Sequence, residues 1–80
     1  MKLPRDLSGS ELIRKLNKLG YQVTRQTGSH VRLTRDTKKG KQHLTIPLHS
    51  LLRVGTLSNI LNEISMQLSI SKDDLLNKLK

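Results

Sequence analysis

The first hydrophobic residues of the chain follow helical spacing. They recur every three or four residues and would share one face of a helix: Leu12, Ile13, Leu16 and Leu19. Ser8 precedes this stretch and Glu11 follows Ser8 by three residues, which is the spacing of a capping box, where each side chain accepts a hydrogen bond from the other's backbone N–H. Gly20 can adopt the left-handed conformation that ends a helix. The pattern predicts an amphipathic helix between Ser8 and Gly20.

From Tyr21 the period changes to two, which is typical of strands with one buried face. Three such segments follow, residues 21–26, 30–35 and 43–47, with their apolar positions at Tyr21 and Val23, at Val31 and Leu33, and at Leu44 and Ile46. The polar run DTKKGK separates the last two segments, and Pro47 ends the third. The pattern predicts an antiparallel meander with one apolar face and one polar face.

A second helical pattern follows the predicted sheet. Within residues 56–65 the apolar positions again share one face: Leu57, Ile60, Leu61 and Ile64. We expect Gly55 or Thr56 to cap this helix. A third, short helix is predicted from Ser71, with two aspartates in its first turn, where the helix dipole favours negative charge.

The predicted order is therefore α-β-β-β-α with an extra C-terminal helix. Each main helix has one apolar stripe and the sheet has one apolar face, so the economical packing places the helices on one face of a three-stranded antiparallel sheet. The chain has 80 residues and no apparent linker or repeat, which indicates a single α+β domain over residues 1–80.

Composition and charge narrow the range of functions. The chain has no cysteine, no Phe and no Trp, which excludes a disulfide framework, a thiol nucleophile and a broad aromatic platform for bases. Residues 1–53 contain 12 basic and three acidic residues and so carry the whole net charge of +9. This uneven charge favours a polyanion, and nucleic acid in particular, as the partner. No leader or long apolar run is apparent, so we expect a cytoplasmic protein without a membrane partner.

His30 is the residue most suited to chemistry. Period two places it on the polar face of its strand with Arg32 and Thr34, and Gly28 before it permits a left-handed entry to the strand. Histidine exchanges a proton near neutral pH. In RNA the ribose 2′-hydroxyl attacks the adjacent phosphate, so a protein needs to supply only proton transfer and positive charge. His30 is therefore a candidate general base or acid of a ribonuclease, although a polar residue at a strand start is the simpler alternative.

The other candidate site residues surround this histidine in the sequence. Ser29 is a candidate for phosphate binding, and the cations expected to bind the RNA backbone are Arg25, Arg32, Lys38, Lys39 and Lys41. His43 starts the third strand and is a candidate second proton-transfer group on the same face. His49 follows Pro47 in a loop, which it could brace, or it could approach the site.

Other kinds of site have weaker support. The acidic residues are scattered, which argues against a metal-dependent nuclease, and the three histidines form no zinc motif. We expect no metal and no cofactor. The alternative from another class is a non-catalytic RNA-binding module, in which His30 only hydrogen-bonds to phosphate or to a 2′-hydroxyl. A pure protein-interaction domain leaves the placement of the charge unexplained.

Two segments resemble those of the HicA toxin family, the mRNA-interferase half of HicA–HicB toxin–antitoxin modules. LSGSELIRKLNKLGYQVTRQTGSHVRL is similar to the family's opening helix, first strand and Gly-Ser-His segment, and LTIPLHSLLRVGTLSNIL is similar to its third strand, P-x-H turn and helix start. The resemblance covers roughly residues 3–64. After Ile64 the chain departs from the family, with SMQLSISKDD in place of an alanine-glycine step and a short acidic segment.

The resemblance implies a fold like that of double-stranded-RNA-binding domains and an endoribonuclease acting on mRNA. It implies a catalytic role for His30, since the histidine of the family's Gly-Ser-His segment is needed for toxicity. It also implies a HicB-like antitoxin partner that covers the active surface, and a toxin that halts translation by degrading transcripts.

Overall fold

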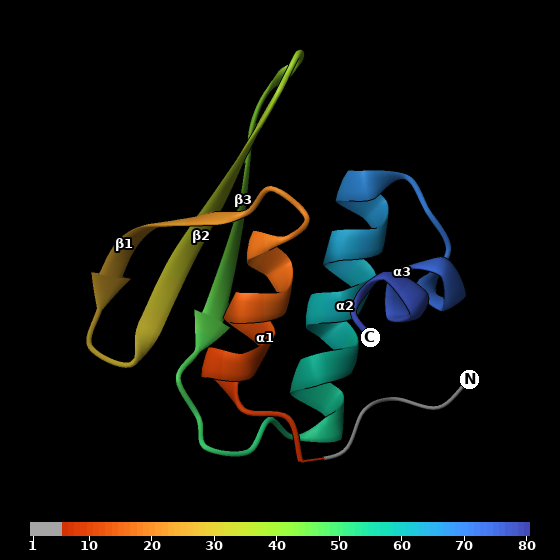
Figure 1. Cartoon of the computed structure of the whole chain (residues 1–80). Coiled ribbons are helices and arrows are strands. Elements are labelled where there is room, and N and C mark those ends of the chain that lie inside the picture. Colours follow the sequence, from red (N-terminus) through yellow and green to blue (C-terminus); the bar gives the residue numbers. More distant parts are fainter. Residues whose placement is uncertain (1–5) are drawn as a thin grey trace.

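The computed structural model describes residues 6–80, and the start of the predicted domain, residues 1–5, lies outside that range. The elements in chain order are α1 (Gly9–Asn17), β1 (Gln22–Thr27), β2 (His30–Thr37), β3 (Gly40–Pro47), α2 (Val54–Leu68) and α3 (Lys72–Lys78) (Figure 1). The predicted order, α-β-β-β-α with a short helix at the end, is confirmed.

The capping box at the start of α1 is present as predicted. The Ser8 side chain accepts a hydrogen bond from the Glu11 backbone N–H at 3.1 Å, and the Glu11 carboxylate accepts one from the Ser8 backbone N–H at 3.2 Å. These bonds, with Arg14 and Lys15 nearby, lower the pKa of the exposed Glu11 carboxyl. The start of α1 is thus fixed by residues within one helical turn.

The three strands form one antiparallel sheet in the order β1-β2-β3. α1 and α2 pack on one face of it, and α3 packs against α2 (Figure 1). The buried apolar residues of β2 and β3 alternate with exposed ones and face the helices: Val31, Leu33, Leu44 and Ile46. We call the opposite, uncovered side of the sheet the solvent face. The α+β fold with helices on one face, like that of double-stranded-RNA-binding domains, is confirmed.

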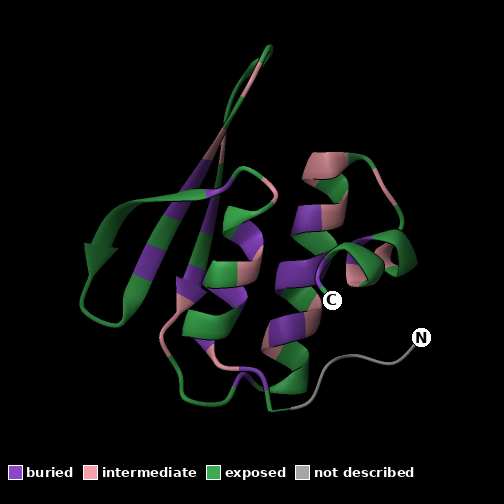
Figure 2. Ribbon diagram, in the orientation of Figure 1, coloured by how far each residue is buried: buried purple, intermediate pink, exposed green. Residues whose placement is uncertain are grey.

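The first strand departs from its predicted pattern. All six residues of β1 are exposed, because the helices lie over β2 and β3 and do not reach β1 (Figure 2). Val23 pairs with Leu33 and shares its face, but 51% of Val23 is exposed, so the prediction of a buried Val23 was wrong. Tyr21, just before the strand, is fully buried and donates a hydrogen bond to Gln67 Oε1 of α2 at 2.6 Å.

The N-caps of the two later helices agree only partly with those expected from the sequence. α2 begins at Val54, two residues before the prediction, and its N-cap is Arg53, which makes no side-chain capping bond. The expected caps at Gly55 and Thr56 were therefore wrong. α3 starts after Ser71 as predicted, with the Ser71 hydroxyl accepting from the Asp74 N–H. α3 also contributes Leu75 to the core.

Candidate functional site

His30 enters the sheet directly from a tight hairpin turn. Thr27 of β1 pairs with His30 of β2, which leaves a two-residue loop of Gly28 and Ser29. Gly28 has φ 57°, a left-handed conformation that glycine adopts without strain, and a glycine at the first loop position is typical of type II′ hairpin turns. The glycine thus permits the turn that places the histidine at the first position of β2.

The turn is attached to the loop after β3, and that loop is attached to the start of α1. The Ser29 carbonyl accepts a hydrogen bond from the Leu48 N–H at 2.7 Å, and the His49 carbonyl accepts one from the Gly9 N–H at 2.9 Å. A Cβ on Gly9 would collide with the Pro47 carbonyl, so α1 approaches this loop more closely than other residues permit. The Gly-Ser-His turn, the Pro47–His49 loop and the start of α1 therefore form one connected support beside His30.

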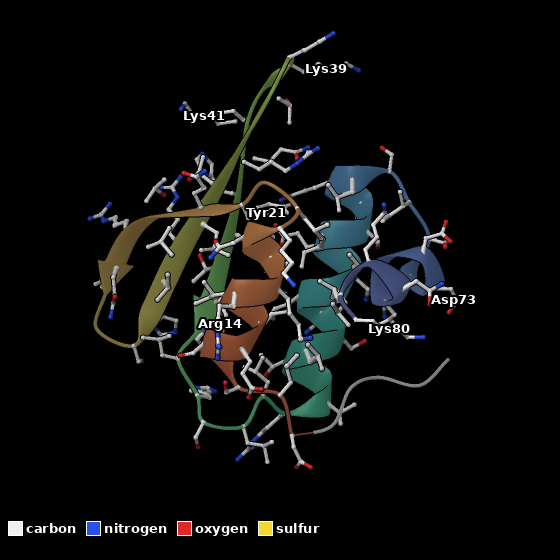
Figure 3. The ribbon with its side chains drawn as sticks, viewed as in Figure 1. Arg14, Tyr21, Lys39, Lys41, Asp73 and Lys80 are labelled. Atoms are coloured by element: carbon white, nitrogen blue, oxygen red, sulfur yellow. The ribbon has the colours of Figure 1, made fainter. Side chains whose placement is uncertain are left out.

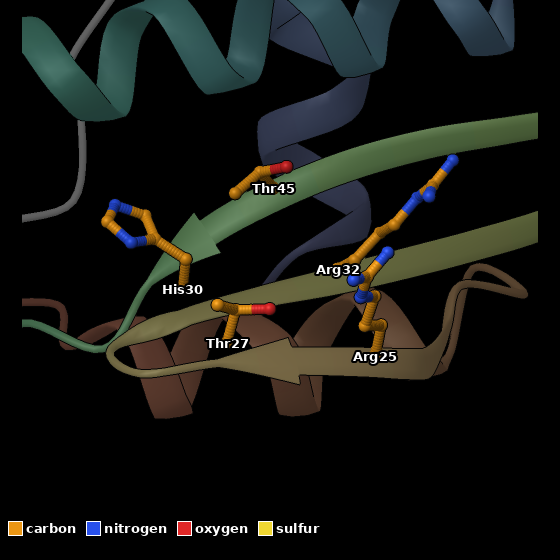
Figure 4. Close-up of a pocket in the computed structure, with 5 residues that line it drawn as sticks. All are labelled: Arg25, Thr27, His30, Arg32 and Thr45. Atoms are coloured by element: carbon orange, nitrogen blue, oxygen red, sulfur yellow. The ribbon is translucent and has the colours of Figure 1, made fainter.

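His30 lies at one end of an open hollow on the solvent face. The hollow has a volume of about 190 Å³ and is lined by Arg25, Thr27, His30, Arg32 and Thr45. All five side chains project from the same side of the sheet, with the two arginines side by side and His30 at the end near the turn (Figure 4). The predicted placement of His30 with Arg32 on the exposed polar face agrees with the structure.

A β-bulge brings Arg25 into this hollow. Val23 pairs with Leu33, but the next pair along the strands is Arg25 with Arg32, so Thr24 is the extra residue. Strict alternation would place Arg25 on the same face as Val23. The bulge instead turns the Arg25 side chain to the solvent face, where it lies directly opposite another guanidinium.

The arginine pair has no acidic partner in the part of the chain described. Two like charges at directly opposite positions of an antiparallel ladder repel each other, typically by a few tenths of a kcal/mol up to about 1 kcal/mol. Within residues 6–80 the ion pair within 4 Å is Lys41 with Asp36, which involves neither arginine. An anion bound between Arg25 and Arg32 would relieve the repulsion, so the hollow is suited to phosphate.

The three predicted lysines lie elsewhere. Lys38 and Lys39 form the turn between β2 and β3, at the far end of the hairpin from His30. Figure 3 shows Lys39 at the outer tip of this hairpin. From residue 30 to residue 37 a strand spans roughly 23 Å. Lys41 is near the same tip and pairs with Asp36 at 3.1 Å. The three lysines therefore lie away from the hollow, because the turn is at the opposite end of the hairpin, and they remain candidates for binding the RNA backbone.

The two other histidines do not line the hollow. His43 is on the solvent face, but it pairs with Thr34, four residues along β2 from His30 and so roughly 13 Å away. That separation is too long for the two histidines to act on one phosphate. His49 is exposed in the loop after β3, and its backbone carbonyl accepts the hydrogen bond from the Gly9 N–H.

Thr27 and Thr45 are lining residues that were not singled out from the sequence. Both stand at alternating polar positions, and Thr45 pairs directly with Arg32. Period two was the available signal, but threonine is common on the polar face of any strand. Their hydroxyls add hydrogen-bonding groups to a hollow whose charge comes from the arginines.

Metal-binding groups and membrane-spanning helices were also sought among the described residues. Over residues 6–80 no three His, Asp or Glu side chains come together in a way that could hold a metal ion. Along the same range, none of the helices has both the length and the apolar character required to cross a lipid bilayer.

Comparison with protein families gives a match that covers this site. The model of the family described as the HicA toxin of bacterial toxin–antitoxin matches residues 9–66. No significant match was found among curated proteins or among solved structures. The matched region runs from the start of α1 almost to the end of α2 and includes the whole sheet, and of the helices described within residues 6–80 only α3 lies beyond it. The chain therefore belongs to the HicA family of bacterial toxins, and a cognate antitoxin is implied as its partner.

Proposed function

We propose that this toxin is an endoribonuclease that cleaves mRNA and blocks translation, with His30 as the proton-transfer group. The observation that carries the proposal is the hollow shared by His30, Arg25 and Arg32, in which neither arginine has an acidic partner from residues 6–80. A group that can exchange a proton lies beside a site suited to one phosphate, on a rigid and open sheet face. Family membership supports a toxin, and this geometry favours RNA as its target.

The proposed reaction uses the substrate's own nucleophile. The ribose 2′-oxygen attacks the adjacent phosphorus and loses its proton to a base, the bond from phosphorus to the 5′-oxygen breaks, and the departing 5′-oxygen gains a proton. His30 is the base or the acid in this exchange. Arg25 and Arg32 stabilise the extra negative charge on the pentacoordinate phosphorus. Because the nucleophile is a hydroxyl of the RNA, no metal-bound hydroxide is required.

The remaining candidate residues act in RNA binding. Gly28 and Ser29 shape the approach to His30, and the exposed Ser29 side chain adds a hydroxyl near the phosphate. Lys38, Lys39 and Lys41 contact the backbone further along the strand. The partner is a HicB-like antitoxin that covers this basic face, and the place of action is the cytoplasm, where mRNA is translated.

The test is a cleavage assay with purified protein and mRNA in the presence of EDTA. We expect the wild type to leave 2′,3′-cyclic phosphate and 5′-hydroxyl ends, and His30→Ala to lower the rate by at least about 100-fold, the usual effect of losing a proton-transfer group. His49→Ala is the matched control, since His49 is also an exposed histidine but lies outside the hollow.

Two results would contradict the proposal. Cleavage by His30→Ala at the wild-type rate would remove the histidine from the reaction. If neither protein cuts RNA but both bind it equally, the chain is a non-catalytic RNA-binding module that uses the same face.

A further inference from the structure

Further along the solvent face, His43 belongs to a chain of hydrogen bonds across all three strands. His43 Nδ1 lies 3.0 Å from the Thr34 hydroxyl, and the Thr34 hydroxyl lies 2.7 Å from the Thr24 hydroxyl. The Thr24 hydroxyl in turn lies 3.5 Å from the carbonyl of Arg32. The Thr34 side chain is buried, and its hydroxyl is held by the hydrogen bonds to Thr24 and His43. This chain fixes the orientation of an exposed imidazole.

The direction of the chain follows from counting protons. The Arg32 carbonyl can only accept, so an arrangement that makes the 3.5 Å contact as well as the two shorter ones gives the single proton of the Thr24 hydroxyl to that carbonyl. The Thr34 hydroxyl must then donate to Thr24, and it accepts from His43 Nδ1. All three hydrogen bonds form together only when Nδ1 carries a proton. In the neutral ring, Nε2 is then a hydrogen-bond acceptor, and none of the hydrogen bonds among residues 6–80 uses it.

We propose that His43 forms a ribose-binding subsite in which its Nε2 accepts a hydrogen bond from a 2′-hydroxyl of the RNA. A phosphate cannot donate to an unprotonated nitrogen, whereas a 2′-hydroxyl can. The 2′-hydroxyl is also the group that distinguishes RNA from DNA. The inference rests on the proposed function in one respect, which is that RNA lies on the solvent face.

The spacing of the strand positions gives the path of the RNA. His30, Arg32 and Thr34 occupy successive solvent-facing positions of β2, each separated by two residues or roughly 6.7 Å. This is close to the distance between successive nucleotides in an extended strand. An RNA strand that runs along β2, with its scissile phosphate in the hollow between His30 and the arginine pair, therefore places a ribose further along the strand at His43. The same path leads on to the lysines at the hairpin tip.

The test compares binding of one sequence as RNA and as DNA. All proteins carry His30→Ala so that the RNA stays intact, and the probes are unstructured oligonucleotides of roughly 12 nucleotides, long enough to span the strand positions of the site, measured by fluorescence anisotropy. Adding His43→Ala should weaken RNA binding about three- to tenfold, the usual effect of removing one hydrogen bond. DNA binding should stay within about twofold, because DNA has no 2′-hydroxyl to lose.

Two further variants make the result specific. Thr34→Val keeps the shape of the side chain and removes the hydroxyl that orients the ring, so it should lower the RNA-to-DNA affinity ratio in the same direction. His49→Ala should leave that ratio unchanged, because His49 lies off the sheet face. An equal loss of affinity for RNA and DNA in His43→Ala would indicate binding to phosphate and overturn the ribose subsite, as would no loss for either.

Failure of this inference is distinguishable from failure of the proposed function. Cleavage by the wild type with an unchanged RNA-to-DNA ratio in His43→Ala would overturn the ribose subsite and leave the ribonuclease intact. A selective loss of RNA binding in His43→Ala, with no cleavage by the wild type, would support the subsite and contradict the ribonuclease.

Discussion

The two ends of the β2–β3 hairpin carry the same kind of charge but are held in different ways. At the His30 end, the Gly-Ser turn is bonded to Leu48, and the loop after β3 is bonded to Gly9 of α1. At the tip, the turn of Lys38 and Lys39 is closed by its own residues, since the Thr37 hydroxyl donates to the Gly40 carbonyl at 2.7 Å. The tip also extends past the helices (Figure 1).

This contrast separates cations that suit chemistry from cations that suit capture of the substrate. Stabilising a transition state requires donors that are already in position, because rearrangement during the reaction reduces their contribution. Arg25 and Arg32 stand opposite each other on a sheet region attached to the helices. The tip lysines have no such support, but long-range attraction of a polyanion depends on charge and needs little geometry. The arginine pair is thus suited to the proposed reaction and the tip to the proposed binding of RNA.

The largest expected difference is between two double variants, each of which removes two positive charges from one end of the hairpin. Arg25→Ala with Arg32→Ala should lower kcat by about 100-fold or more, as expected when donors to the transition state are removed. Lys38→Ala with Lys39→Ala should leave kcat unchanged and raise KM several-fold. In both double variants, the slope of log affinity for RNA against log salt concentration should become less steep by about 0.7 for each phosphate that is no longer bound. An equal decrease of kcat in the two double variants would remove the distinction.

Local signals were enough to predict part of this arrangement. The capping box of α1 lies within four residues, so Ser8 and Glu11 could be assigned without knowledge of the rest of the fold. Period two placed His30 and Arg32 on one face, because alternation is a local property of strands. These features depend on few neighbours.

The features that were missed depend on how distant segments meet. Val23 is exposed because the helices do not reach β1, and no pattern within β1 contains that information. The bulge at Thr24 decides the side on which Arg25 lies, and it is visible only in the register with β2. The lysines were grouped with His30 by nearness in sequence, although an eight-residue strand separates them. The hydrogen bond between Thr34 and His43 likewise requires the β2–β3 register.

A smaller effect, on both stability and cleavage, should follow when the contact between α1 and the loop after β3 is disturbed. Gly9→Ala should lower the free energy of unfolding by about 1–3 kcal/mol, because the added Cβ meets the Pro47 carbonyl and the loop must shift. Cleavage should fall as well, since that loop holds the Ser29 carbonyl through Leu48. Urea denaturation and the cleavage assay measure the two effects.

Gly55→Ala provides the matched control for this substitution. Gly55 lies in the first turn of α2, and a Cβ there would meet nothing within 4 Å. Alanine should leave stability unchanged or raise it by up to about 1 kcal/mol, as expected for a helical glycine. A similar decrease of stability in both variants would show that the close approach at Gly9 has no special role in the support.

The smallest expected effect on stability concerns the hydrogen bonds that hold the middle of β3 to α2. We call the part of the hairpin from His30 to these bonds the anchored region. Tyr21 donates to Gln67 Oε1, and Gln67 Nε2 donates to the His43 carbonyl at 2.9 Å, so α2 holds the middle of β3 through this pair. Tyr21→Phe removes the first bond and should lower the free energy of unfolding by about 1 kcal/mol. The outward tip should be unaffected, and the salt dependence of RNA binding should therefore stay at its wild-type value.

The same tyrosine gives a pH dependence with a definite sign. Burial raises the pKa of Tyr21 above its ordinary value of 10.0, so above that pH the unfolded chain releases the phenol proton more readily than the folded one. The contribution of Tyr21 is complete below pH 10 and is lost as the pH rises through the folded pKa. Since Tyr21 is the one tyrosine of the chain, tyrosinate absorbance reports it alone. A titration midpoint that is the same in folded and urea-unfolded protein would show that α2 does not close over Tyr21, and the anchored region would then end closer to His30.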